Sequence, residues 1–205
     1  MGVVSLALGG SLTITSDLGA SPTNLLSLTV SRATGIQLSI AVFLMFTFYV
    51  IVQAVLLKKE FKPIQLLQLL FAMIFGQFIG FFVAFFQLET DHLGIRFAML
   101  FMGFLCLGIG VFLTVRSRLV PLPPEGMVAA VATRFSIDLG KAKNVVDVFL
   151  FSISVTLLLA SRLAFVGIGI GTILSAIVVG RIVFLLNRFF NDWVERLLFD
   201  DKEMT

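Results

Sequence analysis

The chain has very few of the residues on which soluble enzymes and metal-binding proteins depend. Its 205 residues include one cysteine, one histidine, one tryptophan and one tyrosine, and only 13% are charged, whereas soluble domains carry about 25% charged residues. Cys106 lies inside an apolar run, which excludes an intramolecular disulfide and a thiolate metal cluster. His92 stands beside Asp91 in a short polar gap, and we interpret it as a solvated loop residue.

Motifs of hydrolytic or nucleotide-dependent chemistry are also missing. The sequence contains no HExxH, no GxSxG and no pair of intramembrane aspartates. The segment Gly167-Ile-Gly-Ile-Gly171 resembles a dinucleotide loop, but it begins an apolar run without the preceding strand or the following acidic residue. We therefore expect no enzyme activity, no cofactor and no metal. The net charge of +3 does not indicate nucleic-acid binding, because the basic residues lie between apolar runs.

Hydrophobic residues are abundant instead. They make up 59% of the chain, and phenylalanine alone contributes 23. A membrane-spanning helix needs about 20 mostly apolar residues. Runs that reach or approach this length cover Met1–Ser16, Ile36–Leu57, Leu66–Phe86, Phe97–Val115, Val145–Ala160 and Leu163–Leu186. We expect an all-α membrane protein with six transmembrane helices. The first is short, about 22 Å at the helical rise per residue, so either this helix is stunted or the start of the chain is assigned too late.

The basic residues predict the orientation, because loops rich in Lys and Arg remain cytoplasmic. The sparse side has only Arg32, Arg96 and Arg162. The rich side has Lys58, Lys59, Lys62, Arg116, Arg118, Arg134, Lys141, Lys143, Arg188, Arg196 and Lys202. We expect a multi-pass membrane protein with both termini in the cytoplasm. Apolar residues at near-helical spacing in the tail, 188–205, predict an amphipathic helix at the cytoplasmic interface.

The sequence contains an internal repeat. The segment from Gly2 to Ile14 aligns with the segment from Gly103 to Val115, and Pro22 then falls on Pro123 without a gap. A small shift in the next loop places Gly76-Gln77 on Gly180-Arg181. Each half, 1–86 and 97–187, then holds three spans. An odd number of spans per half predicts an inverted-topology 3+3 repeat, which is typical of transporters but also occurs in other membrane proteins.

Two short helices headed by proline occupy equivalent places in the halves. Ser21, Pro22 and Asn24 open a segment that runs to Arg32 and closes at Gly35, with a serine cap and proline at the first helical position. Pro123, Pro124 and Glu125 open the matching segment to Arg134. If these helices are re-entrant, their N-terminal N–H groups can hold an anion or a polar headgroup. If they lie on the surface, they are connectors; their apolar sequences favour the partly buried arrangement.

Ionisable residues inside spans are the other candidates for a binding site, because each is costly in hydrocarbon unless paired or hydrated. Asp147 lies early in the fifth span and Arg181 late in the sixth. They can form a buried pair, or Asp147 can pair locally with Lys143 or Lys141 while Arg181 reaches the lipid headgroups. Gln77, the repeat counterpart of Arg181, indicates that this position faces the interior. The small residues Gly76, Gly80, Gly171, Ser175 and Gly180 predict close helix packing.

Several motifs resemble the bacterial YczE/YitT-type membrane proteins. They are the glycine-rich first span, the turn Asp17-Leu-Gly-Ala-Ser-Pro22, Thr34-Gly35, and Gly169-Ile-Gly-Thr-Ile with Gly180. The resemblance covers nearly the whole chain, and the end of the chain soon after Trp193 matches the shorter YczE form, which lacks a soluble C-terminal domain. The aromatic residue that usually follows the proline is replaced by Thr23. The resemblance implies a bacterial inner-membrane protein but no defined substrate.

These patterns favour a secondary transporter or permease of a small polar, anionic or amphiphilic solute. The alternatives are a non-transporting accessory protein that acts through a membrane partner, and the substrate-binding subunit of a larger uptake system. The expected partners are the lipid bilayer, a small molecule, and another membrane protein or a second copy of the chain.

Overall fold

The computed structural model describes residues 1–86, 92–116, 120–162 and 167–199. All regular structure in these ranges is helical, which confirms the all-α class. The elements are α1 (Gly2–Thr15), α2 (Pro22–Thr34), α3 (Leu38–Leu57), the 3-10 turns η1 (Lys58–Glu60) and η2 (Pro63–Leu66), α4 (Leu67–Phe85), α5 (Leu93–Arg116), α6 (Pro123–Phe135), α7 (Leu139–Ala160) and α8 (Ile170–Phe199).

Five helices, namely α3, α4, α5, α7 and α8, are long and apolar enough to cross a membrane. In each of these helices, at most 44% of the apolar stretch that would lie in the membrane is buried inside the protein. Large apolar side chains such as Phe48, Phe81 and Phe85 therefore face outward, which suits a hydrocarbon solvent and not water. The chain is a multi-pass membrane protein. The first predicted span falls short, because α1 has only 14 residues.

The observed ends of two helices differ from the predicted spans for local reasons. Helix α7 begins six residues before Val145, because Asp138 caps it and accepts a hydrogen bond from the Gly140 N–H at 2.7 Å. Helix α8 begins at Ile170, because Gly167, with φ of 77°, belongs to a turn before it. The C-terminal tail continues α8 as far as Phe199. Residues 200–205 of the predicted tail lie outside the described residues.

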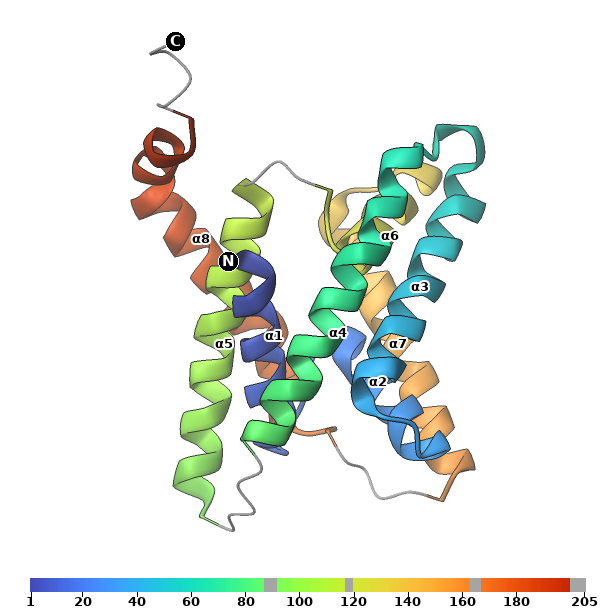
Figure 1. The fold of residues 1–205 in the computed structure, drawn as a ribbon, viewed down its shortest axis with the longest axis vertical. Coiled ribbons are helices and arrows are strands. Elements are labelled where there is room, and N and C mark those ends of the chain that lie inside the picture. Colours follow the sequence, from blue (N-terminus) through green and yellow to red (C-terminus); the bar gives the residue numbers. More distant parts are fainter. Residues whose placement is uncertain (87–91, 117–119, 163–166, 200–205) are drawn as a thin grey trace.

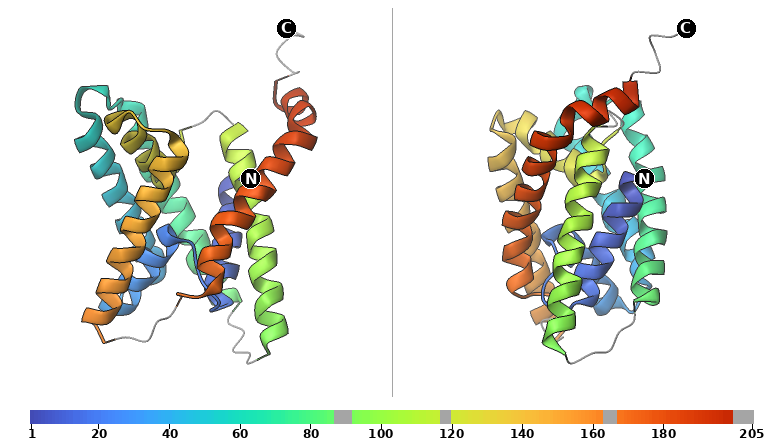
Figure 2. Two further views of the ribbon diagram at one scale, coloured as in Figure 1. Left: turned by 180° about the vertical axis from the view of Figure 1, so that it is seen from behind. Right: turned by 90° about the vertical axis from the view of Figure 1, so that its left-hand side faces the viewer.

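Helices α1 and α5 form the tightest pair in the molecule. A Cβ atom on Gly9 would lie 2.7 Å from the carbonyl oxygen of Gly103, and one on Gly2 would lie 3.3 Å from that of Gly110. Only glycine permits this approach of two backbones. Since the residue number rises on α1 as it falls on α5, the two helices run antiparallel. Figure 1 shows α1 beside α5, and Figure 2 shows the pair from behind and from the side.

The turn after α1 is held by the neighbouring elements. The Arg96 side chain, at the start of α5, donates to the carbonyl oxygens of Ser16 at 2.7 Å and Asp17 at 2.8 Å, and pairs with the Asp17 carboxylate at 3.0 Å. The Gly171 N–H donates to the Leu18 carbonyl oxygen at 2.8 Å. The glycines at 167–171 thus serve a close backbone contact in this turn.

The remaining helices pack in a matched pattern. Helix α4 lies against α1, and α8 lies against α5; α6 packs on α3, and α2 packs on α7. One pairing is unmatched: α3 and α4 pack closely, whereas α7 and α8 are not a closely packed pair over the described residues. Figure 2 shows α7 and α8 diverging when the molecule is seen from behind.

The glycines predicted to serve packing behave differently from one another. Gly76 and Gly80 on α4 both lie against Ser39 at the start of α3, and Gly171 lies against the turn after α1. A Cβ on Gly180, in contrast, would meet nothing within 4 Å. The packing role predicted for Gly180 is therefore wrong, because this glycine borders a cavity.

Candidate solute-binding site

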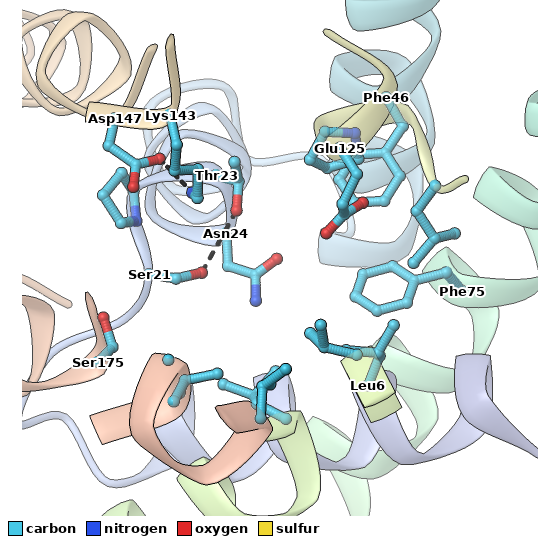
Figure 3. Close-up of a pocket in the computed structure, with 18 residues that line it drawn as sticks. Leu6, Ser21, Thr23, Asn24, Phe46, Phe75, Glu125, Lys143, Asp147 and Ser175 are labelled. Carbon is cyan, nitrogen blue, oxygen red and sulfur yellow. Dashed lines mark hydrogen bonds and ion pairs between the residues drawn. The ribbon is translucent and has the colours of Figure 1, made fainter. Parts of the chain in front are cut away.

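A cavity of about 410 Å³ lies between the first turns of α2 and α6, and residues of α1, α5, α7 and α8 complete its lining. Figure 3 shows its lining from both halves of the chain. Its polar wall consists of Ser21, Thr23, Asn24, Glu125, Lys143, Asp147 and Ser175. Its apolar wall includes Leu6, Phe46, Phe75, Leu107, Val111, Val179 and Val183. A volume of this size accommodates a small organic molecule.

The short helices begin as the sequence predicts. Helix α2 starts at Pro22 and ends before Gly35, which adopts the left-handed conformation with φ of 74°. Ser21 occupies the cap position, but its hydroxyl pairs with the Thr23 hydroxyl at 3.3 Å and makes no cap hydrogen bond. Helix α6 starts with Pro123. Most of the first two turns of each helix is buried, so both are interior elements and not surface connectors.

A pair of buried glutamines, which sequence reasoning missed, positions the start of α6. Gln53 on α3 and Gln68 on α4 exchange two amide hydrogen bonds of 3.0 Å, and both side chains are fully buried. Gln53 also donates to the Pro123 carbonyl oxygen at 3.2 Å. A Cβ on Gly126 would lie 2.5 Å from the Gln53 Oε1 atom. The presence of Gln53 and Gln68 inside two apolar runs was the available signal, because an intramembrane amide needs a partner.

Asn24 is the most distinctive polar group of the cavity. Its residue is only 5% exposed, and its amide makes no hydrogen bond to the residues that the structure describes. Its amide atoms are not sealed in the protein interior either, because they face the open space seen in Figure 3. The amide therefore has a free donor and a free acceptor directed into the cavity.

Glu125 lies in the first turn of α6, outside the five spanning helices. Its side chain is exposed because it points into the cavity. Burial raises the pKa of the Glu125 carboxyl, while the bond to its own backbone N–H and the charge of Lys143 lower the pKa, and Asp147 raises it. Glu125 is thus within electrostatic range of Lys143 and Asp147 on α7.

Asp147 pairs with Lys143, one turn earlier on α7, with the Nζ and Oδ1 atoms 2.5 Å apart. The local pairing is thus the one observed, and the alternative pair with Arg181 is not formed. Arg181 lies on an exposed face of α8 beside Ile177 and Phe184. Gln77 on α4 is exposed as well. The prediction that the shared repeat position of Gln77 and Arg181 faces the interior is therefore wrong, because both helices turn that face outward.

The structure brings together most of the predicted site residues, namely Ser21, Pro22, Asn24, Pro124, Glu125 and Asp147. Pro123 reaches the site only through its carbonyl oxygen, which Gln53 binds. Ser175 and Gly180, predicted as packing residues, also line the cavity. The apolar wall was missed, because nothing in the sequence separates Phe46 and Phe75 from the many other phenylalanines. Their rings stack with centroids 5.1 Å apart.

Comparisons with known proteins give one match. Residues 1–188 match the model of a family described as a family of unknown function (DUF6198). No curated protein and no solved structure matches the chain. None of these comparisons links the chain to the YczE/YitT-type proteins. Among the described residues, no group of three or more His, Cys, Asp or Glu side chains is placed to hold a metal ion.

Proposed function

The chain belongs to the DUF6198 family, a family of unknown function, and we propose from its own geometry that it is a secondary transporter or permease of a small polar or amphiphilic solute. The observation that carries the proposal is a central cavity lined by equivalent positions of the two halves. Supporting observations come from the packing register, the lining and the distribution of charge.

The register of α1 on α5 supports an inverted repeat. The alignment of Gly2 with Gly103 sets an offset of 101, which also aligns Gly9 with Gly110. Exchanging the two halves converts the contact between Gly9 and Gly103 into one between Gly110 and Gly2, and both contacts occur. The helices are antiparallel, so the operation that exchanges them is a two-fold rotation about an axis perpendicular to both. Such an axis lies in the plane of the membrane, as in transporters built from inverted repeats.

The cavity lies at this axis and draws on both halves. Under the same offset, Leu6 corresponds to Leu107, and Asn24 corresponds to Glu125; all four line the cavity. In this arrangement α1, despite its 14 residues, is the sixth crossing, and α2 and α6 are re-entrant helices that meet near the midplane. A site at the interface between inverted repeats is where alternating access places a solute.

The two sides of the cavity differ in the way that alternating access requires. Phe46 on α3 stacks on Phe75 on α4 and fills the space between these helices. The counterpart of Phe46 in the second half is Asp147, and the counterpart of Phe75 is Val179, because the shift in the loop before α4 raises the offset to that of Gly76 and Gly180. Asp147 and Val179 border the open cavity. Helices α7 and α8 do not pack closely over the described residues. An exchange of the two packings, with α7 closing on α8 and α3 parting from α4, moves the opening to the opposite face.

The open side faces the cytoplasm in this proposal. Lys143, which lines the cavity, belongs to the start of α7, and α7 begins at the end of the molecule that carries the α3–α4 connection and the end of α8, at the top of Figure 1. That end also carries most of the basic residues, including Lys58 and Lys59. Because positively charged loops remain cytoplasmic, both termini are assigned to the cytoplasm.

The test combines ligand binding with flux. Detergent-purified protein is screened by thermal shift against ions, polyamines, amino acids, peptides and lipids, and each stabilising solute is then followed into proteoliposomes. We expect saturable stabilisation and uptake, both lost in Asn24→Leu, which keeps the side-chain size but removes the cavity amide. Gln77→Leu removes an amide from the exposed face of α4 and should change neither. Binding without flux contradicts transport by this chain alone and favours the substrate-binding subunit of a larger uptake system. No response to any solute favours the accessory role.

A further inference from the structure

The charges that line the cavity indicate which class of solute it binds. Among the described residues, the charged side chains of the lining are Glu125 on α6 and Lys143 and Asp147 on α7. Two carboxylates and one ammonium give a net charge of −1 when all are ionised. Lys143 and Asp147 already neutralise each other in an ion pair. Glu125 makes no ion pair with any described residue, so its carboxylate is the uncompensated charge.

The N-termini of α2 and α6 have few free N–H groups that could bind an anion. The first residue of α2 and the first two residues of α6 are prolines, which have no N–H to donate. The next N–H of α6, that of Glu125, favours the ionised form of the carboxyl group of the same residue. The positive end of α6 thus already holds a negative charge of the protein. An anionic solute would have to displace it or lie beside it.

The free amide of Asn24 lines the same cavity as Glu125, and both side chains point into its open space in Figure 3, where they form a polar patch. As the repeat counterpart of Glu125, it lies at the matching place on α2. Burial without a partner is costly for an amide, so a ligand or solvent must satisfy it. Its Oδ1 atom and the Glu125 carboxylate are both acceptors, which suits a donor such as an alkylammonium group. Beside Glu125 in Figure 3, the stacked rings of Phe46 and Phe75 form an apolar wall.

We propose that the cavity binds a monovalent organic cation, a protonated amine attached to an apolar body. The ammonium group donates to the Glu125 carboxylate and to Asn24 Oδ1, and the apolar body packs against Phe46, Phe75 and the aliphatic side chains of α1 and α5. This inference names the class of solute that the proposed transporter binds. It rests on the proposed function only because both concern the same cavity. Binding can therefore be tested separately from flux.

The test uses three probes that share one apolar body: 2-phenylethylammonium, 3-phenylpropionate and phenylalanine. Binding to the full-length protein in detergent is measured by calorimetry. We expect saturable binding of the cation, about tenfold or more tighter than that of the anion or the zwitterion, because only the cation complements Glu125. Equal or tighter binding of the anion or the zwitterion, or no saturable binding of the cation, overturns the proposal.

Variants locate the site. Glu125→Gln should weaken binding of the cation about tenfold, while Glu60→Gln, on the exposed turn η1, should leave it unchanged. Asn24→Asp adds a carboxylate to the same patch and should tighten binding, which protects the test against a Glu125 variant that fails to fold. Binding that is unaffected by Glu125→Gln in a folded protein, or weakened by Asn24→Asp, contradicts the proposal.

The pH dependence supplies a further readout. Protonation of Glu125 removes the charge that attracts the cation, and burial raises the pKa of this carboxyl. Binding should therefore weaken as the pH falls, at higher pH than for an exposed glutamate, and the profile of Glu125→Gln should lack this transition. Cation binding without uptake into liposomes would refute the transporter and retain this inference. Uptake of an anion would do the opposite.

Discussion

The buried glutamine pair gives a prediction that can be worked from the structure. Gln53→Leu removes both amide bonds to Gln68 and the donor to the Pro123 carbonyl oxygen, and leaves the fully buried Gln68 amide without its partner. An unsatisfied buried amide costs about 1 to 3 kcal/mol. We expect a loss of about 2 to 3 kcal/mol in the free energy of unfolding for Gln53→Leu, and about 1 to 3 kcal/mol for Gln68→Leu.

The double variant should be less destabilised than the sum of the two single variants, because neither amide is then left unpaired. Measured side-chain hydrogen bonds in a membrane protein contribute about 0.6 kcal/mol each on average. Two bonds predict a coupling energy of roughly 1 to 2 kcal/mol. The assay is reversible unfolding in mixed micelles by titration with a denaturing detergent, with Gln77→Leu as the exposed control. Additivity within about 0.5 kcal/mol would refute the reciprocal pairing.

Two further predictions concern the packing of α1. Gly9→Ala places a methyl group 2.6 Å from the Leu107 backbone nitrogen and should destabilise the protein by about 1 to 3 kcal/mol, whereas Gly180→Ala, with nothing within 4 Å, should be neutral or stabilising by up to about 1 kcal/mol. Thermal unfolding of both variants checks this, and equal losses would contradict the assigned contacts. Arg96→Ala removes three hydrogen bonds to Ser16 and Asp17 and should cost about 1 to 2 kcal/mol. Arg96→Lys should recover little of this stability, since one ammonium cannot reproduce the hydrogen bonds of the guanidinium group. The control Arg32→Ala, at an exposed position, should stay within about 0.5 kcal/mol of the wild-type stability. Full rescue by lysine would show that charge alone matters.

Local signals in the sequence predicted much of the fold. Pro22 marked the start of α2, because proline fixes a backbone angle that suits the first turn of a helix. Gly35 marked the end of α2, because glycine tolerates the left-handed backbone conformation found there. At the other end of α6, Ser136 takes the left-handed conformation with φ of 53°, and no glycine marked it. The length of the apolar runs predicted the five long spanning helices. The first run was also counted as a span, but its helix α1 has only 14 residues, so its length alone does not identify it as a membrane crossing.

The site was only partly predictable, because periodicity does not say which face of an apolar helix turns inward. Asp147 was identified from its cost in hydrocarbon, but the sequence left open whether it pairs with Arg181 or locally, and the structure shows the local pair with Lys143. Gln77 and Arg181 carried the same signal but lie on outward faces. The hydrogen bonds between Gln53 and Gln68 depend on the contact between α3 and α4, and the sequence of either helix alone does not reveal that contact.

The central claim is that the cavity opens toward the cytoplasm between α7 and α8 and is closed on the other face by Phe46 and Phe75. The most direct test places a single cysteine at the cavity wall, as Thr23→Cys in a Cys106→Ser background, and measures its reaction with a membrane-impermeant maleimide in inverted and right-side-out vesicles. The account predicts faster labelling in the inverted vesicles, slowed by 2-phenylethylammonium. Faster labelling from outside, equal rates from both faces, or no labelling from either would contradict it.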